Sequence, residues 1–435
     1  MITLNHMEDI NMLLQFSVGN FRSIRDTAVL SLEASADKSH TNNLVKQGKD
    51  TVLKSAVIYG ANAAGKSNIF KALTAAILTV RESDIRQVGA PLIHIVPFKF
   101  DKEYIDAPTE FEFVFNTDGK KYVYGFSATF TEIVTEYLYE YKTAKATTVF
   151  IRDEREKEVY KFTNPAYQKN LKPVVDKNTK NKLFLATATN WNCEETKIPF
   201  LWLTNLINTY DTKYDQLISL TGPMFEDDAD GSLKRFTSNL IKEADINISD
   251  YSIQSRELVG EGDLPPELGG GHGTIFRQKQ YAINTLHEIE SSDNGEKTQV
   301  SLNLKDESAG TQNLFFFSPI LKRAFSTGET ICIDEFDANM HPMLLEFLVG
   351  LFNDPEINIA NAQLIISSHN TTLLNLELLR RDQFYFIEKD NKTGSSELFS
   401  MDEFSVRKSE DVRRAYLLGR FGAIPDIGEG YAIWQ

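Results

Sequence analysis

The segment Gly60-Ala-Asn-Ala-Ala-Gly-Lys66-Ser67 decides the fold of this chain, because it matches the phosphate-binding loop pattern G-x-x-x-x-G-K-[ST] at every fixed position. It follows the apolar stretch 56–59, which predicts a buried strand, and it precedes residues 68–78, whose apolar positions have helical spacing. A glycine loop between a strand and a helix N-terminus forms an anion site, because its N–H groups and the helix dipole attract negative charge. We expect Lys66 to reach the β- and γ-phosphates of a nucleotide and Ser67 to bind Mg²⁺.

Composition places the chain among ordinary globular proteins, since 42% of its 435 residues are hydrophobic and 25% are charged. Its apolar runs are far shorter than a membrane span, and its N-terminus lacks the basic and apolar regions of a secretion signal. The two cysteines, Cys193 and Cys332, form neither a metal-binding pattern nor a disulfide framework. We therefore expect a cytoplasmic protein without membrane contact, in which Cys332 is a small core residue.

The net charge of −15 argues against a broad nucleic-acid-binding surface, because neutralising phosphates requires clustered Lys and Arg. This net charge is compatible with a local basic patch. Residues 406–420 are rich in Arg and Lys, and two interpretations of them stay open. They form either a solvated helix face or a contact for nucleic acid.

Two further apolar segments end in residues suited to phosphate chemistry. Residues 329–335 predict a short strand that ends in Asp334 and Glu335. In a phosphate-loop NTPase the first acid orients the Mg²⁺ shell, and the second can polarise the attacking water. Residues 363–369 predict another strand that ends in His369, which we expect to contact the γ-phosphate. These residues would lie at the carboxyl edge of a parallel sheet, where α/β proteins bind ligands.

A small polar cluster with a glycine, Ser308-Ala309-Gly310, opens an apolar, helix-like run that continues to residue 321. A serine at a helix N-terminus caps the helix and leaves backbone N–H groups available to an anion. Taken alone, this pattern predicts a helix N-cap.

Together these four elements resemble the ATPase heads of the ABC superfamily, and most closely the branch that contains RecF, SMC and OLD-type proteins. Their order along the chain (phosphate loop, signature, acidic strand, histidine) is the order of that family. Residues 14–24, with the segment Asn20-Phe-Arg-Ser23, resemble the first strand of RecF-like heads. The resemblance implies an α/β fold: an ABC-type P-loop NTPase head with a mixed central sheet, an antiparallel β lobe and a mainly helical insertion.

The resemblance also implies a role for each motif. In such heads the signature of one subunit covers the γ-phosphate held by the phosphate loop of the other, which implies an ATP-sandwiched homodimer or a higher oligomer. Asp334 would be the Walker B acid that binds Mg²⁺ together with Ser67. Glu335 would be the catalytic glutamate and His369 the switch histidine. ATP and Mg²⁺ are the implied cofactors. The residues implied to bind the nucleotide are Gly60, Ala61, Asn62, Ala63, Ala64, Gly65, Lys66, Ser67, Asn68, Ser308, Ala309 and Gly310.

Three features depart from the family pattern. The signature reads Ser-Ala-Gly-Thr-Gln instead of Leu-Ser-Gly-Gly-Gln, so the alignment at Gln312 stays open. The loop after the acidic strand carries His341 where many heads carry an aspartate. Residues 97–100, in the region of the glutamine loop, contain no glutamine, which leaves that position unassigned.

More narrowly, residues 60–68, 307–311 and 416–425 resemble bacterial ATP-binding proteins that carry an AAA label but are built as ABC heads. Many of those proteins belong to abortive-infection and other anti-phage systems. This implies an ATP-hydrolysing switch subunit that works with a separate effector protein, a nuclease or a toxin. One alternative is a RecF-like ATPase of DNA repair or maintenance, which the acidic charge disfavours. Another is a scaffold that uses ATP only as a structural ligand, which Glu335 beside Asp334 disfavours.

The expected domain organisation has three parts: an N-terminal part of the head over residues 12–163, a mainly helical insertion over 164–273, and a C-terminal part of the head over 274–435. Periodicity in the insertion predicts helices at 199–208 and 233–242, with a helical pattern from 164 to about 253. The glycine-rich stretch 261–273 predicts a loop. The insertion is the best candidate for partner contacts.

Aromatic residues alternate with polar ones in the first part, which predicts antiparallel strands. We expect the aromatic rings to form a sheet core, with stacking platforms for nucleic acid as the alternative. The lack of a sustained heptad argues against a long coiled-coil arm. The predicted strands are 109–115, 121–130, 136–141 and 147–152, and a final core strand is predicted at 384–388.

Overall fold

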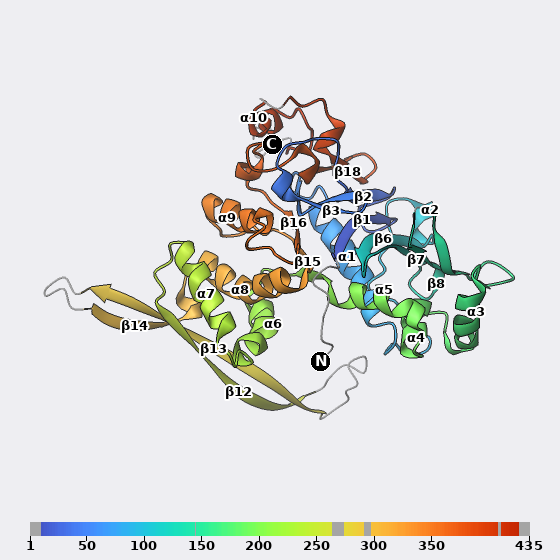
Figure 1. The fold of residues 1–435 in the computed structure, drawn as a ribbon, viewed down its shortest axis with the longest axis horizontal. Coiled ribbons are helices and arrows are strands. Elements are labelled where there is room, and N and C mark those ends of the chain that lie inside the picture. The colour runs from blue at the N-terminus through green and yellow to red at the C-terminus, as the bar shows by residue number, and fades with distance from the viewer. Residues whose placement is uncertain (1–9, 144, 263–273, 291–296, 408–409, 426–435) are drawn as a thin grey trace, which may run out of the picture. The chain divides into compact units, whose positions relative to one another are not determined.

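The computed structural model describes residues 10–143, 145–262, 274–290, 297–407 and 410–425. The chain divides into two compact units (Figure 1). The first comprises Met1–Tyr210, Ala324–Asp337 and Leu345–Gln435, and the second comprises Asp211–Arg323 and Ala338–Leu344. The segment 164–273, expected as one insertion, is thus divided between the two units after Tyr210.

A mostly parallel six-stranded sheet crosses the first unit. In order across the sheet, its strands are β11 (Ile207–Tyr210), β15 (Thr330–Ile333), β16 (Gln363–Ser367), β5 (Ser55–Tyr59), β17 (Phe384–Lys389) and the antiparallel β18 (Ser396–Ser400). The strands β5, β15 and β16 are buried along their whole length, as is typical of parallel strands covered on both faces. Cys332 is fully buried in β15, as expected. Because β16 pairs in parallel with both β15 and β5, the carboxyl ends of these strands meet at one edge.

A seven-stranded antiparallel sheet forms the β lobe of the same unit. Its strands, in order, are β10 (Tyr160–Lys161), β9 (Thr147–Asp153), β8 (Ile133–Tyr141), β7 (Lys120–Ala128), β6 (Thr109–Thr117), β1 (Met12–Gly19) and β2 (Ala28–Ser31). The four strands predicted from alternation are therefore confirmed. A separate hairpin joins β3 (Leu44–Gln47) and β4 (Asp50–Leu53).

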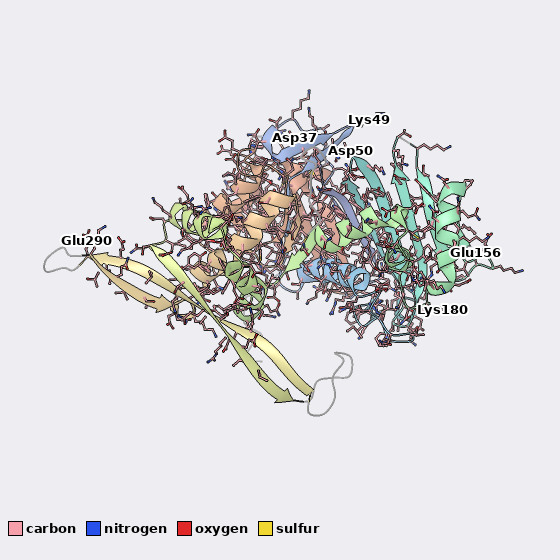
Figure 2. All side chains as sticks on the ribbon, turned by 60° about the horizontal axis from the view of Figure 1, so that its bottom comes forward. Asp37, Lys49, Asp50, Glu156, Lys180 and Glu290 are labelled. Atoms are coloured by element: carbon pink, nitrogen blue, oxygen red, sulfur yellow. The ribbon has the colours of Figure 1, made fainter. Side chains whose placement is uncertain are left out.

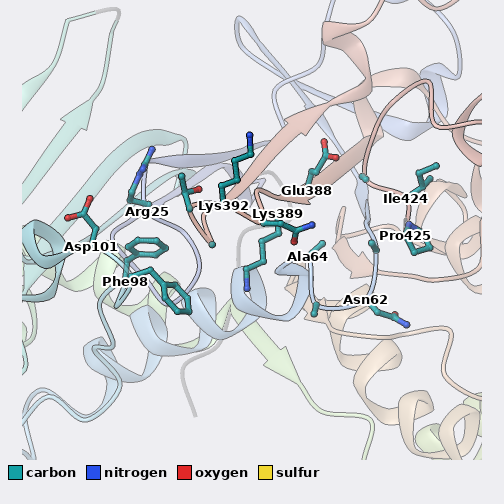
Figure 3. Close-up of a pocket in the computed structure, with 17 residues that line it drawn as sticks. Arg25, Asn62, Ala64, Phe98, Asp101, Glu388, Lys389, Lys392, Ile424 and Pro425 are labelled. Atoms are coloured by element: carbon teal, nitrogen blue, oxygen red, sulfur yellow. The ribbon is translucent and has the colours of Figure 1, made fainter. Parts of the chain in front are cut away.

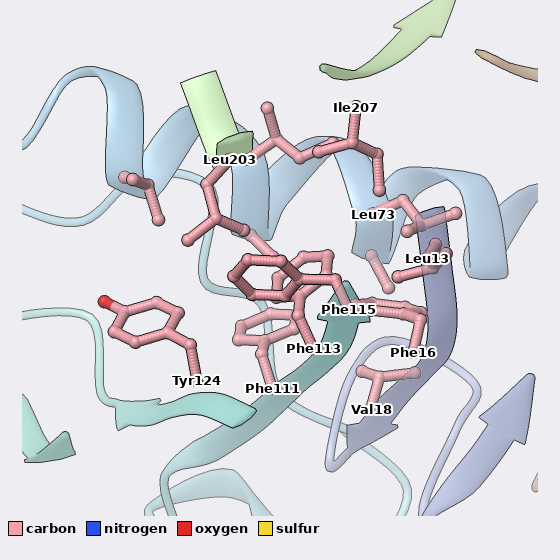
Figure 4. Packing of buried hydrophobic residues seen from close by; sticks show 14 of the residues in the cluster. Leu13, Phe16, Val18, Leu73, Phe111, Phe113, Phe115, Tyr124, Leu203 and Ile207 are labelled. Carbon is pink, nitrogen blue, oxygen red and sulfur yellow. The ribbon is translucent and has the colours of Figure 1, made fainter. Parts of the chain in front are cut away.

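The aromatic side chains of β6 belong to the core of the first unit (Figure 4). Phe111, Phe113 and Phe115 are at most 2% exposed, and the ring of Phe115 stacks on Trp202 at a centroid distance of 4.0 Å. Burial of large rings supplies much of the apolar stabilisation of a core. The sheet-core interpretation therefore holds for these rings.

The helices of the first unit are α1 (Lys66–Arg81), α2 (Lys102–Ile105), α3 (Pro165–Leu171), α4 (Phe184–Asn190), α5 (Glu194–Asn205) and α10 (Val412–Leu417). The helix predicted at 199–208 is wrong in its last residues, because α5 ends at Asn205 and Ile207 begins β11. Pairing with β15 decides this, since Ile207 lies opposite Thr330 in the parallel ladder. In the described part of the chain, no helix is both long and apolar enough to span a bilayer.

The second unit contains the helices α6 (Tyr214–Glu226) and α7 (Ser232–Glu243) and an antiparallel ribbon of the strands β12 (Asp250–Gly262), β13 (Thr274–Glu290) and β14 (Lys297–Asn303). The helices α8 (Ala309–Thr327) and α9 (Pro342–Asn353) contribute residues to both units. The helix predicted at 233–242 is confirmed by α7. The loop predicted at 261–273 lies outside the described residues from 263 onward.

The sequence pattern does not predict the ribbon β12–β13–β14. The helical pattern expected to run to about 253 is wrong from Asp250 onward, where β12 begins. Many ribbon side chains are exposed whichever way they face, so the alternation of apolar and polar residues that marks a half-buried strand is weak here. Figure 2 shows Glu290 where β13 ends.

Candidate functional site

The phosphate loop has a conformation that depends on its small residues. Gly65 has φ of +117° and Ala63 has φ of +61°, so both adopt backbone angles unusual for residues with a side chain. A Cβ atom on Gly60 would lie 2.6 Å from the carbonyl oxygen of Ile387. The loop therefore lies directly against β17.

The Lys66 side chain is buried under this loop and is only 6% exposed. Its Nζ donates to the carbonyl oxygens of Gly60 at 2.6 Å and Ala61 at 3.2 Å. Burial lowers the pKa of Lys66, and the negative charges of Asp334, Glu335 and Asp337 act in the opposite direction. A buried cation surrounded by carbonyl oxygens and facing carboxylates is suited to exchange these weak partners for phosphate oxygens.

A serine cluster holds the loop from the side of β1 and β18. Asn68 Nδ2 donates to Ser23 Oγ at 2.7 Å, and Ser396 Oγ donates to Ala64 O at 2.6 Å. The hydroxyls of Ser23 and Ser396 lie 2.8 Å apart, and Ser23 can donate its proton to Ser396. Ser23, the last residue of the segment Asn20–Ser23, thus supports the phosphate loop, and the side chain of Asn68 is hydrogen-bonded to it. Its nucleotide contact stays a prediction. Ser396 follows no motif, so sequence analysis could not find it.

The acidic pair follows β15 directly, as predicted. The hydroxyl of Ser367, the last residue of β16, donates to Asp334 Oδ1 at 2.5 Å, and Ser367 Oγ accepts from the backbone N–H of Glu335 at 2.8 Å. Glu335 is exposed, and its φ of +52° places it in the left-handed region. Such a backbone costs about 1–3 kcal/mol and is typical of functional sites. No sequence motif marks Ser367, because strand pairing sets its position.

Asp337 connects the acidic strand with the histidine strand. Its Oδ2 accepts the backbone N–H groups of His369 at 3.0 Å and Asn370 at 2.9 Å. Among the described residues, no group hydrogen-bonds to its buried Oδ1. The hydroxyl of Tyr59 donates to Asn370 O at 2.9 Å, which attaches the same turn to β5. His369 itself is exposed. The signal for Asp337 in the sequence is a third acid two residues after Glu335.

The predicted signature lies in the second unit, at the start of α8. Ser308 Oγ accepts the backbone N–H of Thr311 at 3.1 Å, so Ser308 caps the helix as expected. A Cβ atom on Gly310 would lie 2.6 Å from Asn339 O, so glycine is required there. Gln312 Nε2 donates to the carbonyl oxygens of Glu307 at 2.8 Å and Lys305 at 3.1 Å. Gln312 is therefore engaged within its own segment.

His341 also belongs to the second unit, and its Nδ1 accepts the backbone N–H of Met343 at 3.3 Å, at the start of α9. The structure thus brings Lys66, Asp334, Glu335 and His369 to one edge of the parallel sheet of the first unit. It places Ser308, Ala309 and Gly310 in the other unit.

A cavity of about 1090 Å³ adjoins the phosphate loop in the first unit (Figure 3). Its lining combines the loop residues 61–64 with cationic and aromatic side chains, among them Arg25, Phe98, Phe100, Lys389 and Lys392. The ring of Phe100 is 71% exposed and meets the buried ring of Phe98 edge-on at a centroid distance of 5.7 Å. Residues 97–100, in the region of the expected glutamine loop, thus place the aromatic rings of Phe98 and Phe100 at this cavity.

The residues present fit a magnesium ion bound together with a nucleotide. Among the described residues, no group of three or more His, Cys, Asp or Glu is arranged to hold a metal ion unaided. Mg²⁺ in nucleotide sites takes only one or two protein ligands and completes its shell with phosphate oxygens and water. The Ser67 hydroxyl and the Asp334 carboxylate are ligands of that kind.

A comparison with models of protein families covers the residues of this site. A family model described as "AAA domain, putative AbiEii toxin, Type IV TA system" matches residues 55–175 and 215–375. This protein belongs to that family. The match includes the phosphate loop, the segment at Ser308, the acidic pair and His369, and the fold with this loop makes the chain a P-loop ATPase of the AAA type. No curated protein matches the chain in sequence.

One solved structure with a similar fold is titled "Crystal structure of the SmcHead bound to the C-winged helix domain of ScpA". The similarity covers 89% of this AAA-family chain and 97% of that chain, at 11% sequence identity and a TM-score of 0.41.

The packing of Gly60 against β17 makes a stability prediction. In Gly60→Ala the added methyl group overlaps a backbone carbonyl, so we expect the free energy of unfolding to fall by about 1–3 kcal/mol. Thermal melting measures the change. The matched control is Gly350→Ala in α9, where the described structure leaves at least 4 Å around the new Cβ. That variant should melt at or above the parent temperature, because alanine favours helix. Equal melting of the two variants contradicts the packing argument.

Proposed function

We propose that this protein hydrolyses ATP as a nucleotide-driven switch of the RecF, SMC and OLD-like branch, and that it serves an anti-phage defence system with a separate effector protein. One observation carries the ATPase part: a single sheet edge gathers Lys66, the acidic pair and His369. The family description, which names a putative AbiEii toxin and a toxin–antitoxin system, supports the defence part.

The chain's own residues suggest how hydrolysis would proceed. Lys66 exchanges the carbonyl oxygens of the loop for β- and γ-phosphate oxygens and neutralises their charge. Bound Mg²⁺ supplies further neutralisation of the phosphates, with Ser67 and Asp334 as its protein ligands. The carboxylate of Glu335 accepts the proton of the attacking water. His369, held by Asp337 through its backbone, contacts the γ-phosphate.

The signature would act across two copies of the chain. Ser308 and Ala309 are exposed at the N-terminus of α8, where backbone N–H groups and the helix dipole attract an anion. In the proposed dimer, Ser308, Ala309 and Gly310 of one copy cover the γ-phosphate held by Lys66 of the other. Closure of two copies around two ATP molecules and reopening after hydrolysis would be the switch.

The cavity beside the phosphate loop supports a nucleotide ligand. Its volume of about 1090 Å³ is ample for a nucleotide. The exposed ring of Phe100 offers a stacking face for a base, and Arg25, Lys389 and Lys392 add positive charge.

Two substitutions separate binding from hydrolysis. Lys66→Ala should abolish ATP binding, because it removes the buried cation of the loop. Glu335→Gln should bind ATP and accumulate as a closed dimer, with turnover reduced by about 100-fold or more through loss of the general base. Equilibrium ATP binding, phosphate release and sedimentation measure the three effects. A Glu335→Gln protein with the parent turnover rate contradicts the assignment.

The hydrogen bonds of Asp337 predict a separate effect on turnover. Asp337→Ala removes the acceptor of two backbone N–H groups and frees the turn at His369, so kcat should fall about tenfold or more while the ATP Kd stays unchanged. Asp337→Asn keeps one oxygen acceptor and should retain more activity. The control is Asp354→Ala, which also removes an acceptor of a turn N–H in the first unit. If ATP binding and kcat fall together, the substitution has damaged the fold of the unit and the prediction is contradicted.

The defence role is tested by recovering Glu335→Gln protein from its native cells with ATP and Mg²⁺, with Lys66→Ala as the matched control. We expect a stoichiometric protein partner that is absent from the control. Recovery of DNA or RNA without such a partner would instead support a RecF-like role. The net charge of −15 would then not exclude binding to nucleic acid.

A further inference from the structure

The strand β13 reaches the residue directly before the signature serine. Thr285 Oγ1 donates to Glu307 Oε1 at 2.6 Å, and His287 Nε2 lies 2.7 Å from the same oxygen. A carboxylate oxygen only accepts, so His287 Nε2 carries the proton in this contact. Thr285 is fully buried, and the side chains of His287 and Glu307 are 19% and 12% exposed. The carboxylate of Glu307 is thus anchored to the ribbon in a largely desolvated setting.

The backbone of Glu307 is attached to α8 as well. Its carbonyl oxygen accepts from Gln312 Nε2 at 2.8 Å, and Ser308, the next residue, caps the helix through the N–H of Thr311. One residue therefore connects the ribbon with the signature turn. Its carboxylate belongs to the ribbon contact, and its carbonyl belongs to the helix contact.

A second, apolar connection joins the same two elements. Tyr251 of β12 meets Phe315 of α8 edge-on at a centroid distance of 4.8 Å, and Phe225 of α6 stacks on Phe315 at 4.9 Å. Tyr281 of β13 packs on Gly222 of α6, where an added Cβ would lie 2.4 Å from the ring. The base of the ribbon and the first turns of α8 therefore pack as one body within the second unit, and Glu307 is its polar contact nearest the signature.

We propose that Glu307 is a positioning residue: held by Thr285 and His287, it sets the signature turn Ser308–Gly310 so that the ribbon controls the ATP-dependent pairing of two copies. This inference rests on the proposed function. A carboxylate released from the ribbon contact would lie next to the N-terminus of α8, which attracts negative charge, and would compete there with the γ-phosphate. Anchoring Glu307 prevents this competition and fixes the start of the helix.

The test measures ATP-dependent dimerisation of the full chain in the Glu335→Gln background, by sedimentation over a range of protein concentrations. Adding Thr285→Val should raise the dimer dissociation constant about tenfold, equivalent to about 1.4 kcal/mol. Glu307→Gln keeps an acceptor oxygen and carries no charge to compete with the γ-phosphate, so it should dimerise more tightly than Thr285→Val. Thr285→Ser, which restores the hydroxyl, should restore dimerisation. The matched control is Glu288→Gln, the neighbouring exposed acid of β13, which pairs with Lys297 at 3.4 Å and should behave as the parent.

A readout on the single copy separates positioning from damage to the fold. ATP binding at concentrations below dimerisation should stay within about twofold of the parent in every variant, because the phosphate loop lies in the first unit. A Thr285→Val variant that dimerises as well as the parent overturns the inference alone. A Glu335→Gln parent that binds ATP but stays monomeric overturns the proposed function and this inference with it.

Discussion

The parallel pairing of β16 with β5 on one side and β15 on the other is the constraint on which the site depends. Parallel strands point their carboxyl ends to the same edge, so the phosphate loop, the acidic pair and His369 must meet there although they lie far apart in the sequence. The strands are apolar and buried along their whole length, which resists slippage of their register. The positions of the side chains at this edge therefore depend on this strand pairing.

Short hydrogen bonds connect the segments that meet at this edge of the sheet. Ser367 joins β16 to both acids, and Asp337 joins the acidic turn to the turn at His369. Each contact links two strands, so a shift of one strand moves groups on both. Hydrogen bonds to carboxylates in a partly buried setting are stronger than ordinary ones. The ends of β15 and β16 are therefore connected by side-chain hydrogen bonds as well as by the backbone ladder.

The second unit carries the turn Ser308–Gly310, which the sequence predicts as the signature. The N-terminus of α8 is capped by Ser308, approached closely by the backbone of Asn339 at Gly310, and anchored to β13 through Glu307. All three contacts lie within the second unit, so the turn Ser308–Gly310 belongs to the unit that also carries the ribbon. The three strands of the ribbon pair along their length, so this hydrogen-bonded ribbon continues from the contact at Glu307.

The sequence by itself determined the phosphate loop, its flanking strand and helix, the acidic strand, the histidine strand and the four aromatic strands, because each depends on residues close together in the chain. It determined the cap at Ser308 for the same reason. Only the tertiary structure decided that Ile207 starts a strand, that Ser396 and Ser367 support the site, and that Asp337 holds the turn at His369. These roles arise from pairing between distant segments, which leaves no local pattern. The sequence pattern does not predict the ribbon, because many of its side chains are exposed on both faces. Hydrophobic periodicity is weak where few side chains are buried.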